Sequence, residues 1–162
     1  MEPTLPPTLP PTLTPEWRDA IARPPPDALF TPTEDRFTAP FWAAAAQGRL
    51  SLPRCASCGV WAMPPLPFCA ACHAQGHDWP EIAPEGVLHS FTVVTRAILP
   101  EIADHLPYVP ATVTFAQAGG LRLVAAVVDV PVGRIRIGMP LRARFDARAD
   151  GVTVVRFVPA KA

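Results

Sequence analysis

The sequence predicts a mainly β protein, in which a small zinc ribbon is followed by a five-stranded barrel. Two cysteine pairs at CxxC spacing, Cys55/Cys58 and Cys69/Cys72, predict the ribbon. Runs of alternating apolar and polar residues after residue 86 predict the barrel strands. Proline makes up 23 of the 162 residues and is concentrated ahead of both modules. We therefore divide the chain into a Pro-rich extended arm, a helix with the ribbon, and the barrel, at residues 1–38, 39–84 and 85–162.

The arm repeats a Pro-Thr-Leu unit between residues 3 and 13. Proline lacks a backbone N–H and has a fixed φ, so this segment cannot sustain a helix or a central strand. Extended polyproline II structure or disorder is expected instead. The alternatives are a tail without contacts and an arm that lies along a partner subunit. In the second case its anchors would be Leu5, Leu9, Leu13 and Trp17.

Residues 39–48 predict a short helix. Pro40 suits the first helical position, the four alanines favour the interior, and Gly48 suits the stop. The i, i+3, i+4, i+7 spacing places Phe41, Ala44, Ala45 and Gly48 on one face. Two strands are expected in the ribbon, at residues 49–54 and 60–65, and the second ends in a Pro-rich turn.

Four thiolates from two CxxC turns, ten residues apart, can occupy the corners of one tetrahedron. The pattern therefore predicts a structural zinc ion, with no open position for catalysis. Disulfides would need an oxidising compartment, and no signal-peptide pattern is seen at the N-terminus. A redox CxxC usually stands alone beside a βαβ pattern. Another thiolate-bound metal or an iron–sulfur centre stays open as an alternative. The predicted ligands are Cys55, Cys58, Cys69 and Cys72.

Other residues near the cysteines carry weaker signals. His73 and His77 could replace a thiolate, but exposed positions are expected for both because the cysteine set is complete. Trp79 is expected to pack over the metal site. A helix and a ribbon of this size have little core, so we expect metal binding to supply much of the folding free energy. Apolar surface should remain for a partner, from the set Phe41, Trp42, Trp61, Leu66, Phe68 and Trp79.

The barrel strands are expected at residues 87–96, 108–115, 121–128, 140–145 and 152–157. Gly119-Gly120 and Asp150-Gly151 mark turns, and Asp-Gly between alternating runs is a strong hairpin signal. The connection at residues 131–139 is too short and Gly-rich for a helix. Five strands with a long first connection and this non-hairpin link suit a Greek-key barrel of the OB type.

Composition excludes several classes of function. The formal net charge is zero, with 14 basic and 14 acidic side chains, and nucleic-acid binding usually needs a basic excess. The longest apolar run, residues 123–128, has the length of a strand and is far short of the roughly 18 residues of a membrane span. Membrane association is not expected, nucleic acid is disfavoured, and a cytoplasmic location is expected.

A series of short motifs between residues 38 and 160 resembles one known family. In the ribbon half the motifs are Pro40-Phe41-Trp42, Gly48-Arg49-Leu50, Arg54–Gly59 and Pro67–Cys72. In the barrel half they are Gly86, Ser90–Val94, Pro107-Tyr108-Val109 and Ile137–Pro140. The chain is similar in these positions to the zinc-ribbon plus OB-fold proteins known as domain of unknown function 35. Those proteins accompany thiolase-like and MaoC-like hydratase proteins.

The resemblance implies an N-terminal helix, a rubredoxin-like ribbon and a C-terminal barrel. It also implies a non-catalytic accessory subunit, which scaffolds a thiolase-like complex acting on acyl-CoA thioesters and helps to bind the substrate. The residues agree, because every cysteine belongs to a CxxC pair and His89 and His105 stand isolated. CoA carries phosphates and an adenine, so its binding face would use guanidinium groups and an aromatic ring. The candidates for CoA contacts are Arg54, Arg96 and Tyr108.

Two alternatives remain at this point. OB barrels and zinc ribbons both bind single-stranded nucleic acid, although the neutral charge and the lack of an aromatic and basic ladder on the strands disfavour this function. A stand-alone acyl-CoA carrier is the other alternative. The identity of the neighbouring gene would discriminate among the three hypotheses.

Overall fold

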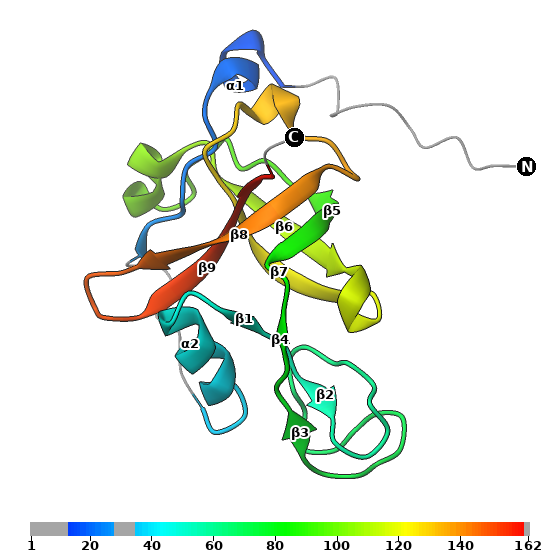
Figure 1. The fold of residues 1–162 in the computed structure, drawn as a ribbon. Helices are drawn as coiled ribbons and strands as arrows, with labels where there is room; N and C mark the ends of the chain where they lie inside the picture. Colours follow the sequence, from blue (N-terminus) through cyan, green and yellow to red (C-terminus); the bar gives the residue numbers. More distant parts are fainter. Residues whose placement is uncertain (1–12, 28–34, 161–162) are drawn as a thin grey trace, which may run out of the picture.

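The computed structural model describes residues 13–27 and 35–160 (Figure 1). Its main body is a closed barrel with the strand order β5 (Glu85–Phe91), β6 (Val109–Phe115), β7 (Leu121–Val127), β9 (Thr153–Pro159) and β8 (Pro140–Ala147). Two small sheets form the ribbon: β1 (Leu50–Ser51) with β4 (Glu81–Ile82), and β2 (Arg54–Cys55) with β3 (His77–Asp78). The predicted fold class is confirmed. No helix in the described ranges reaches the length and apolarity of a membrane span.

The first described segment is part of the barrel body and is not a free extended arm. Helix α1 (Pro15–Asp19) begins it, and Ala22 then donates its N–H to the carbonyl of Val130 at 2.9 Å. Ala22 is fully buried, and Leu13 packs against the hydrophobic core. Leu13, which would anchor on a partner subunit if the segment were such an arm, thus packs against the core of its own chain. The sequence could not show this, because the core that receives the segment is built by residues more than 80 positions later.

Helix α1 packs so closely against residue 133 that only a glycine fits at this position. A Cβ atom at Gly133 would lie 2.9 Å from the carbonyl oxygen of Arg18. Such contacts essentially never occur, so a side chain at this position would push the helix away from the short η4 turn (Val132–Arg134). The predicted absence of an α-helix between the third and fourth barrel strands agrees with this three-residue turn. Residues 1–12, with the predicted anchors Leu5 and Leu9, lie outside the described residues.

Helix α2 (Ala39–Ala46) matches the predicted helix to within two residues, and it begins one residue before Pro40. Phe41, Ala44 and Ala45 are buried, as their spacing predicts. Gly48 lies beyond the helix with a φ of +70° and is exposed, so it serves the turn and not the buried face. In Figure 1 this helix and the ribbon lie at one end of the barrel, and α1 lies at the opposite end.

The ribbon strands are shorter than the sequence predicts. The expected strand at residues 49–54 is split into β1 and β2, which pair with different partners. The expected strand at residues 60–65 does not form, and Trp61 makes only an isolated bridge to Arg54. Three prolines within positions 53–65 remove backbone donors, so a continuous ladder cannot propagate here.

The barrel strands follow the predicted runs, with one difference at the first. Strand β5 ends at Phe91, after an irregularity between Leu88 and Ser90, whereas the sequence predicts a strand to residue 96. Single bonds continue toward β6, from Thr92 N to the Pro110 carbonyl at 3.0 Å and from Val94 N to the Tyr108 carbonyl at 2.9 Å. The long connection that follows contains η2 (Pro100–His105), and η3 (Ala116–Ala118) joins β6 to β7.

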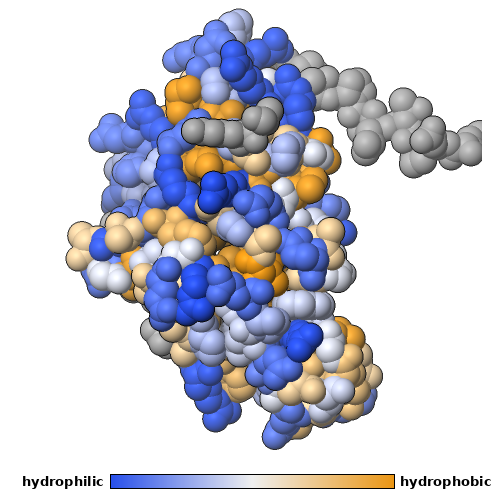
Figure 2. Space-filling view, in the orientation of Figure 1, coloured by the Kyte–Doolittle hydropathy of each residue, from blue (hydrophilic) through white to orange (hydrophobic). Residues whose placement is uncertain are grey.

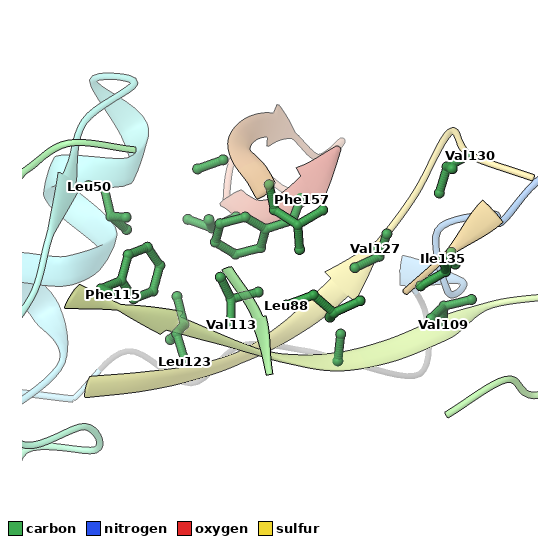
Figure 3. Close-up of a cluster of buried hydrophobic side chains, with 14 of the residues drawn as sticks. Leu50, Leu88, Val109, Val113, Phe115, Leu123, Val127, Val130, Ile135 and Phe157 are labelled. Atoms are coloured by element: carbon green, nitrogen blue, oxygen red, sulfur yellow. The ribbon is translucent and has the colours of Figure 1, made fainter. Parts of the chain in front are cut away.

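The hydrophobic core fills the barrel and continues under α2 and β1 (Figure 3). Phe115 and Phe157 are fully buried at its centre, with ring centroids 6.0 Å apart. Figure 3 shows Leu50 of β1 beside Phe115 at one end of this cluster, so the first ribbon strand is anchored in the barrel core. Burial of such rings contributes most of the driving force for folding.

Candidate metal centre and apolar groove

The four cysteines form one cluster at the far end of the ribbon. All four sulfur atoms lie within 4.8 Å of one another. The Sγ atoms of Cys55 and Cys72 are 3.6 Å apart, as are those of Cys58 and Cys69. A tetrahedral zinc with Zn–S bonds of about 2.3 Å separates its sulfur atoms by about 3.8 Å. The thiols therefore fit a tetrahedral zinc ion, and the closest pairs are too far apart for disulfides.

Tight backbone turns hold each pair of thiols. In the first turn Gly59 N donates to the Cys55 carbonyl at 2.9 Å, and in the second His73 N donates to the Cys69 carbonyl at 2.9 Å. Gly59 and His73 both have positive φ, 72° and 60°, as the last residue of such a turn requires. The two turns are equivalent, which brings the pairs to one point although the chain between them has no regular structure.

The electrostatics of the cluster favour a cation. Backbone N–H groups of Cys58 and Ser57 lower the pKa of the Cys55 thiol to about 6. The Val60 N–H lowers the pKa of Cys58, but burial and the three neighbouring sulfur atoms outweigh it and raise that pKa to about 12. These opposite directions mean that four bare thiolates repel one another too strongly to coexist. A divalent metal removes that repulsion.

The two nearby histidines are outside the metal-ligand cluster found among the described residues. His73 is exposed, and His77 is paired with Cys55 across β2 and β3. Trp79, which the sequence places over the metal, is half-buried against the barrel core instead. That core begins directly beyond β4 and offers the indole more apolar contact than the small ribbon does.

The predicted CoA contacts come from different elements, and Tyr108 is bridged to Val94, two residues before Arg96. Arg54 lies on β2 and forms an exposed ion pair with Asp78 at 3.5 Å. Arg96 is exposed, five residues beyond the end of β5. Tyr108 is half-buried and is the one member of the three that lines a large groove. The role of these residues in CoA binding stays a prediction.

That groove was not found from the sequence. It has a volume of about 600 Å³ and lies within the size range of small-molecule sites. Its walls come from α2, from β6 and β7, from β9 and from the segment at residues 25–27. Most of its surface is apolar, and the aromatic members are Phe41, Trp42 and Tyr108. Only tertiary structure brings these distant positions together.

The polar side of the groove is a network of ion pairs. Arg156 is buried and bonds Asp146 at 2.8 Å and Asp27 at 3.1 Å. Arg148 bonds Asp150 at 2.8 Å and donates to the Asp27 carbonyl at 3.0 Å. The network connects the N-terminal segment to the β8–β9 hairpin. It also neutralises both arginines that line the groove.

Fold and site together define a zinc-ribbon plus OB-barrel protein. Two family models agree: the rubredoxin-like zinc ribbon domain of ChsH2 matches residues 42–78, and the C-terminal OB-fold domain of ChsH2 matches residues 79–146. The chain belongs to this ChsH2-type, DUF35 family. The resemblance seen in the sequence is thereby confirmed.

Particular relatives include a solved structure described as "Ltp2-ChsH2(DUF35) aldolase". It is 34% identical, with a TM-score of 0.72, and the match covers 81% of this chain and 100% of that one. A DUF35 protein of unknown function from Sulfolobus solfataricus is 18% identical with a TM-score of 0.54 over 77% of this chain and 86% of that one, and shows the fold alone.

A curated relative is the probable enoyl-CoA hydratase alpha subunit of Thermomonospora curvata. It is 36% identical over 110 residues, which are 68% of this chain. The match spans 33% of the relative's length, so the chain corresponds to about a third of that protein.

Proposed function

We propose that this protein is a non-catalytic accessory subunit of an enzyme complex that acts on acyl-CoA thioesters. The observation that carries the proposal is the match to the ChsH2 chain of the Ltp2-ChsH2 aldolase, which is similar over its whole length. The similarity to a probable enoyl-CoA hydratase subunit supports the same substrate class. We propose a thiolase-like or MaoC-like protein as the catalytic partner and the cytoplasm as the location.

The side chains support an accessory role. Thioester chemistry often uses a cysteine nucleophile with a nearby base. Here all four cysteines are gathered in the metal cluster. His105 is 3.0 Å from the Pro24 carbonyl, and His89 is exposed on β5, so neither is paired with a nucleophile among the described contacts. The chemistry is therefore assigned to the partner.

The ribbon offers an apolar contact surface for that partner. Val60, Leu66 and Phe68 are 44%, 50% and 56% exposed, which is unusual for such side chains gathered within nine residues. Figure 2 shows hydrophobic colouring on part of the ribbon surface, away from the barrel. Phe41 and Trp61, which the sequence also assigns to a partner, pack instead against the barrel core.

The experiment is co-expression of the tagged chain with a thiolase-like or MaoC-like protein from the same genome. We expect co-purification, and turnover of acyl-CoA thioesters by the complex but not by the isolated chain. A matched control is the same partner purified alone. Turnover by the isolated chain, lost on a point substitution in it, would contradict the accessory role, and so would a partner that is fully active without it.

A further inference from the structure

The groove includes the facing edges of two barrel strands, β7 and β9. Successive side chains of a strand point to opposite faces. Yet consecutive residues of β7, Leu123–Ala126, all line the groove, and so do consecutive residues of β9, Val154–Arg156. Lining by residues of both alternating sets is the pattern expected where the edge of a strand borders a site. Strands β7 and β9 are paired at a single position, Val127 with Phe157, and the groove occupies the seam where they diverge.

The edge of β7 in this seam carries unpaired backbone groups. Pro110 is opposite Ala126 in the β6–β7 register, lacks an N–H, and accepts a bond from Thr92 on the β5 side. Ala126 therefore directs its N–H away from β6. Antiparallel pairs alternate, so Val124, two residues earlier and opposite Thr112, directs both its N–H and its carbonyl the same way. The Val124 side chain is 77% exposed.

The facing edge of β9 has the same property. The Phe157 carbonyl accepts from Val128 N at 2.9 Å, so Phe157 faces β7. By the same alternation Val155 directs its N–H and carbonyl into the seam. Within residues 13–27 and 35–160 no other strand pairs with these positions. Unpaired backbone groups beside apolar walls carry a free-energy cost unless a partner supplies hydrogen bonds to them.

The charged residues of the groove indicate which kind of molecule it can bind. The two arginines of its lining, Arg148 and Arg156, are engaged by Asp27, Asp146 and Asp150. A charged group, such as the phosphates of CoA, finds no surplus cation there, so an uncharged occupant complements the groove. An acyl chain would be uncharged but would leave the strand edges without partners. An extended peptide satisfies both the apolar walls and the backbone groups.

We propose that the seam between β7 and β9 receives an extended, apolar peptide segment of a partner protein, which adds a strand to β7 at Val124 and Ala126. The pocket walls Trp42 and Tyr108 then contact alternate side chains of that segment. This inference deepens the proposed function, on which the identity of the partner as an acyl-CoA enzyme subunit rests. Main-chain bonds provide affinity in this mode of binding, and the pockets provide specificity.

The first test is residue-resolved hydrogen exchange in the isolated full chain. We expect the amides of Val124 and Ala126 to exchange at least tenfold faster than those of Leu123 and Ala125, which face β6. Slow exchange at all four positions would mean that the edge is already covered by the chain itself, and would overturn the proposal.

The second test uses a random heptapeptide library displayed on phage and selected against the full chain. Selected peptides should slow exchange at Val124 and Ala126. N-methylation of one alternate set of peptide amides should weaken binding at least tenfold, and this readout does not depend on the folding of a variant. Val124→Pro, which removes the open N–H, should weaken binding at least tenfold, while Val124→Thr as a matched control should stay within twofold.

Two results would contradict the inference. One is a selection that yields no peptide able to protect these amides from exchange. The other is protection of the amides by added dodecanoyl-CoA when no peptide protects them, which would make the groove an acyl site.

The same exchange measurement in the purified enzyme complex separates the two proposals. Protection of both amides by at least tenfold is expected on assembly. If the complex forms and turns over acyl-CoA while the amides exchange as in the free chain, the function stands and the strand addition is wrong. If no complex forms, the proposed function fails, and the peptide experiment still decides what the seam binds.

Discussion

The ribbon and the barrel are both built from antiparallel β-structure, yet they are stabilised in different ways. In the barrel, side chains from every strand meet in a closed core, and Val113, Phe115, Leu141 and Phe157 are fully buried. Between residues 56 and 84 of the ribbon, Pro65 alone is buried. Its strands have two residues each. The barrel is therefore stabilised by apolar burial, whereas the ribbon has almost no buried core to stabilise it.

The two regions are joined by a few apolar contacts. Leu50 and Leu52 leave the ribbon and enter the barrel core. Trp61 packs back onto the barrel, where a Cβ atom at Gly119 would lie 3.2 Å from the indole ring. Changing Trp61 would therefore disturb this joint as well as any partner contact, so it is a poor probe of the ribbon surface.

Removal of the metal should have the largest effect on the stability of the ribbon relative to that of the barrel. We expect about one zinc per chain, held by the four cysteines. Cys69→Ser should abolish metal binding and unfold the ribbon while the barrel remains, because the ribbon has almost no core of its own. Metal analysis and a two-dimensional amide spectrum check this, with the exposed Ser57→Ala as control. Absence of both zinc and iron from the purified protein, or loss of barrel signals in the variant, would contradict it.

Truncation of the N-terminal segment tests whether the barrel core is complete without it. Deleting residues 1–27 removes Ala22 and Leu13 from the core and Asp27 from Arg156, so we expect a loss of about 3–5 kcal/mol of unfolding free energy, as for a large core truncation. Chemical denaturation measures it. Deleting residues 1–12 is the matched control, because it spares all of these contacts. Equal stability of the two truncated chains would show that the segment is dispensable to the barrel.

The ion pairs of Asp146 test how much charge interactions add to apolar burial in stabilising the barrel. Burial alone would raise the pKa of Asp146, but bonds from Arg144 and Arg156 outweigh it and lower the pKa. Because the folded pKa is below the unfolded value of about 3.9, the network stabilises the fold above that pH. The contribution is lost as the pH falls through the folded pKa. Asp146→Asn should cost about 2 kcal/mol at pH 7.

Denaturant melts of both proteins at several pH values check this result. The difference between them should shrink below about pH 4, where the carboxyl of the parent chain becomes protonated. A constant difference across that range would assign the loss to altered packing instead of charge. Glu85→Gln, which alters the exposed Arg142 pair at 3.7 Å, is the matched control, with an expected effect below about 0.5 kcal/mol.

The smallest effect on stability is expected at the exposed ribbon surface. Phe68 is 56% exposed, so Phe68→Ser should change unfolding free energy by less than about 0.5 kcal/mol. The same change should weaken the complex with the catalytic partner at least tenfold, as isothermal calorimetry would show. Ile98→Ser, at a site 84% exposed on the barrel side, is the control. Equal affinity of both variants would place the partner contact elsewhere.

Local patterns were sufficient to predict the ribbon ligands and the strands. CxxC spacing, alternating runs and Asp-Gly turns are properties of short stretches; the four cysteines do lie in one cluster, and the closed barrel confirms the predicted fold. Residues 60–65 form no strand, since the prolines there override the apolar pattern, the strand predicted at residues 49–54 is split in two, and β5 ends at Phe91 instead of residue 96. The CoA candidates stay a prediction, because residue type and loop position do not determine which distant side chains meet at one site.

By itself, the sequence determined what depends on neighbours along the chain: the metal-binding turns, the short helix and the strand sequence of the barrel. Only the tertiary structure decided that residues 13–27 complete the barrel core, that Trp42 and Tyr108 share a groove, and that β7 and β9 diverge beside it. These features depend on contacts between positions up to 129 residues apart, such as Asp27 with Arg156. Such contacts follow from chain closure and packing, which no local spacing encodes.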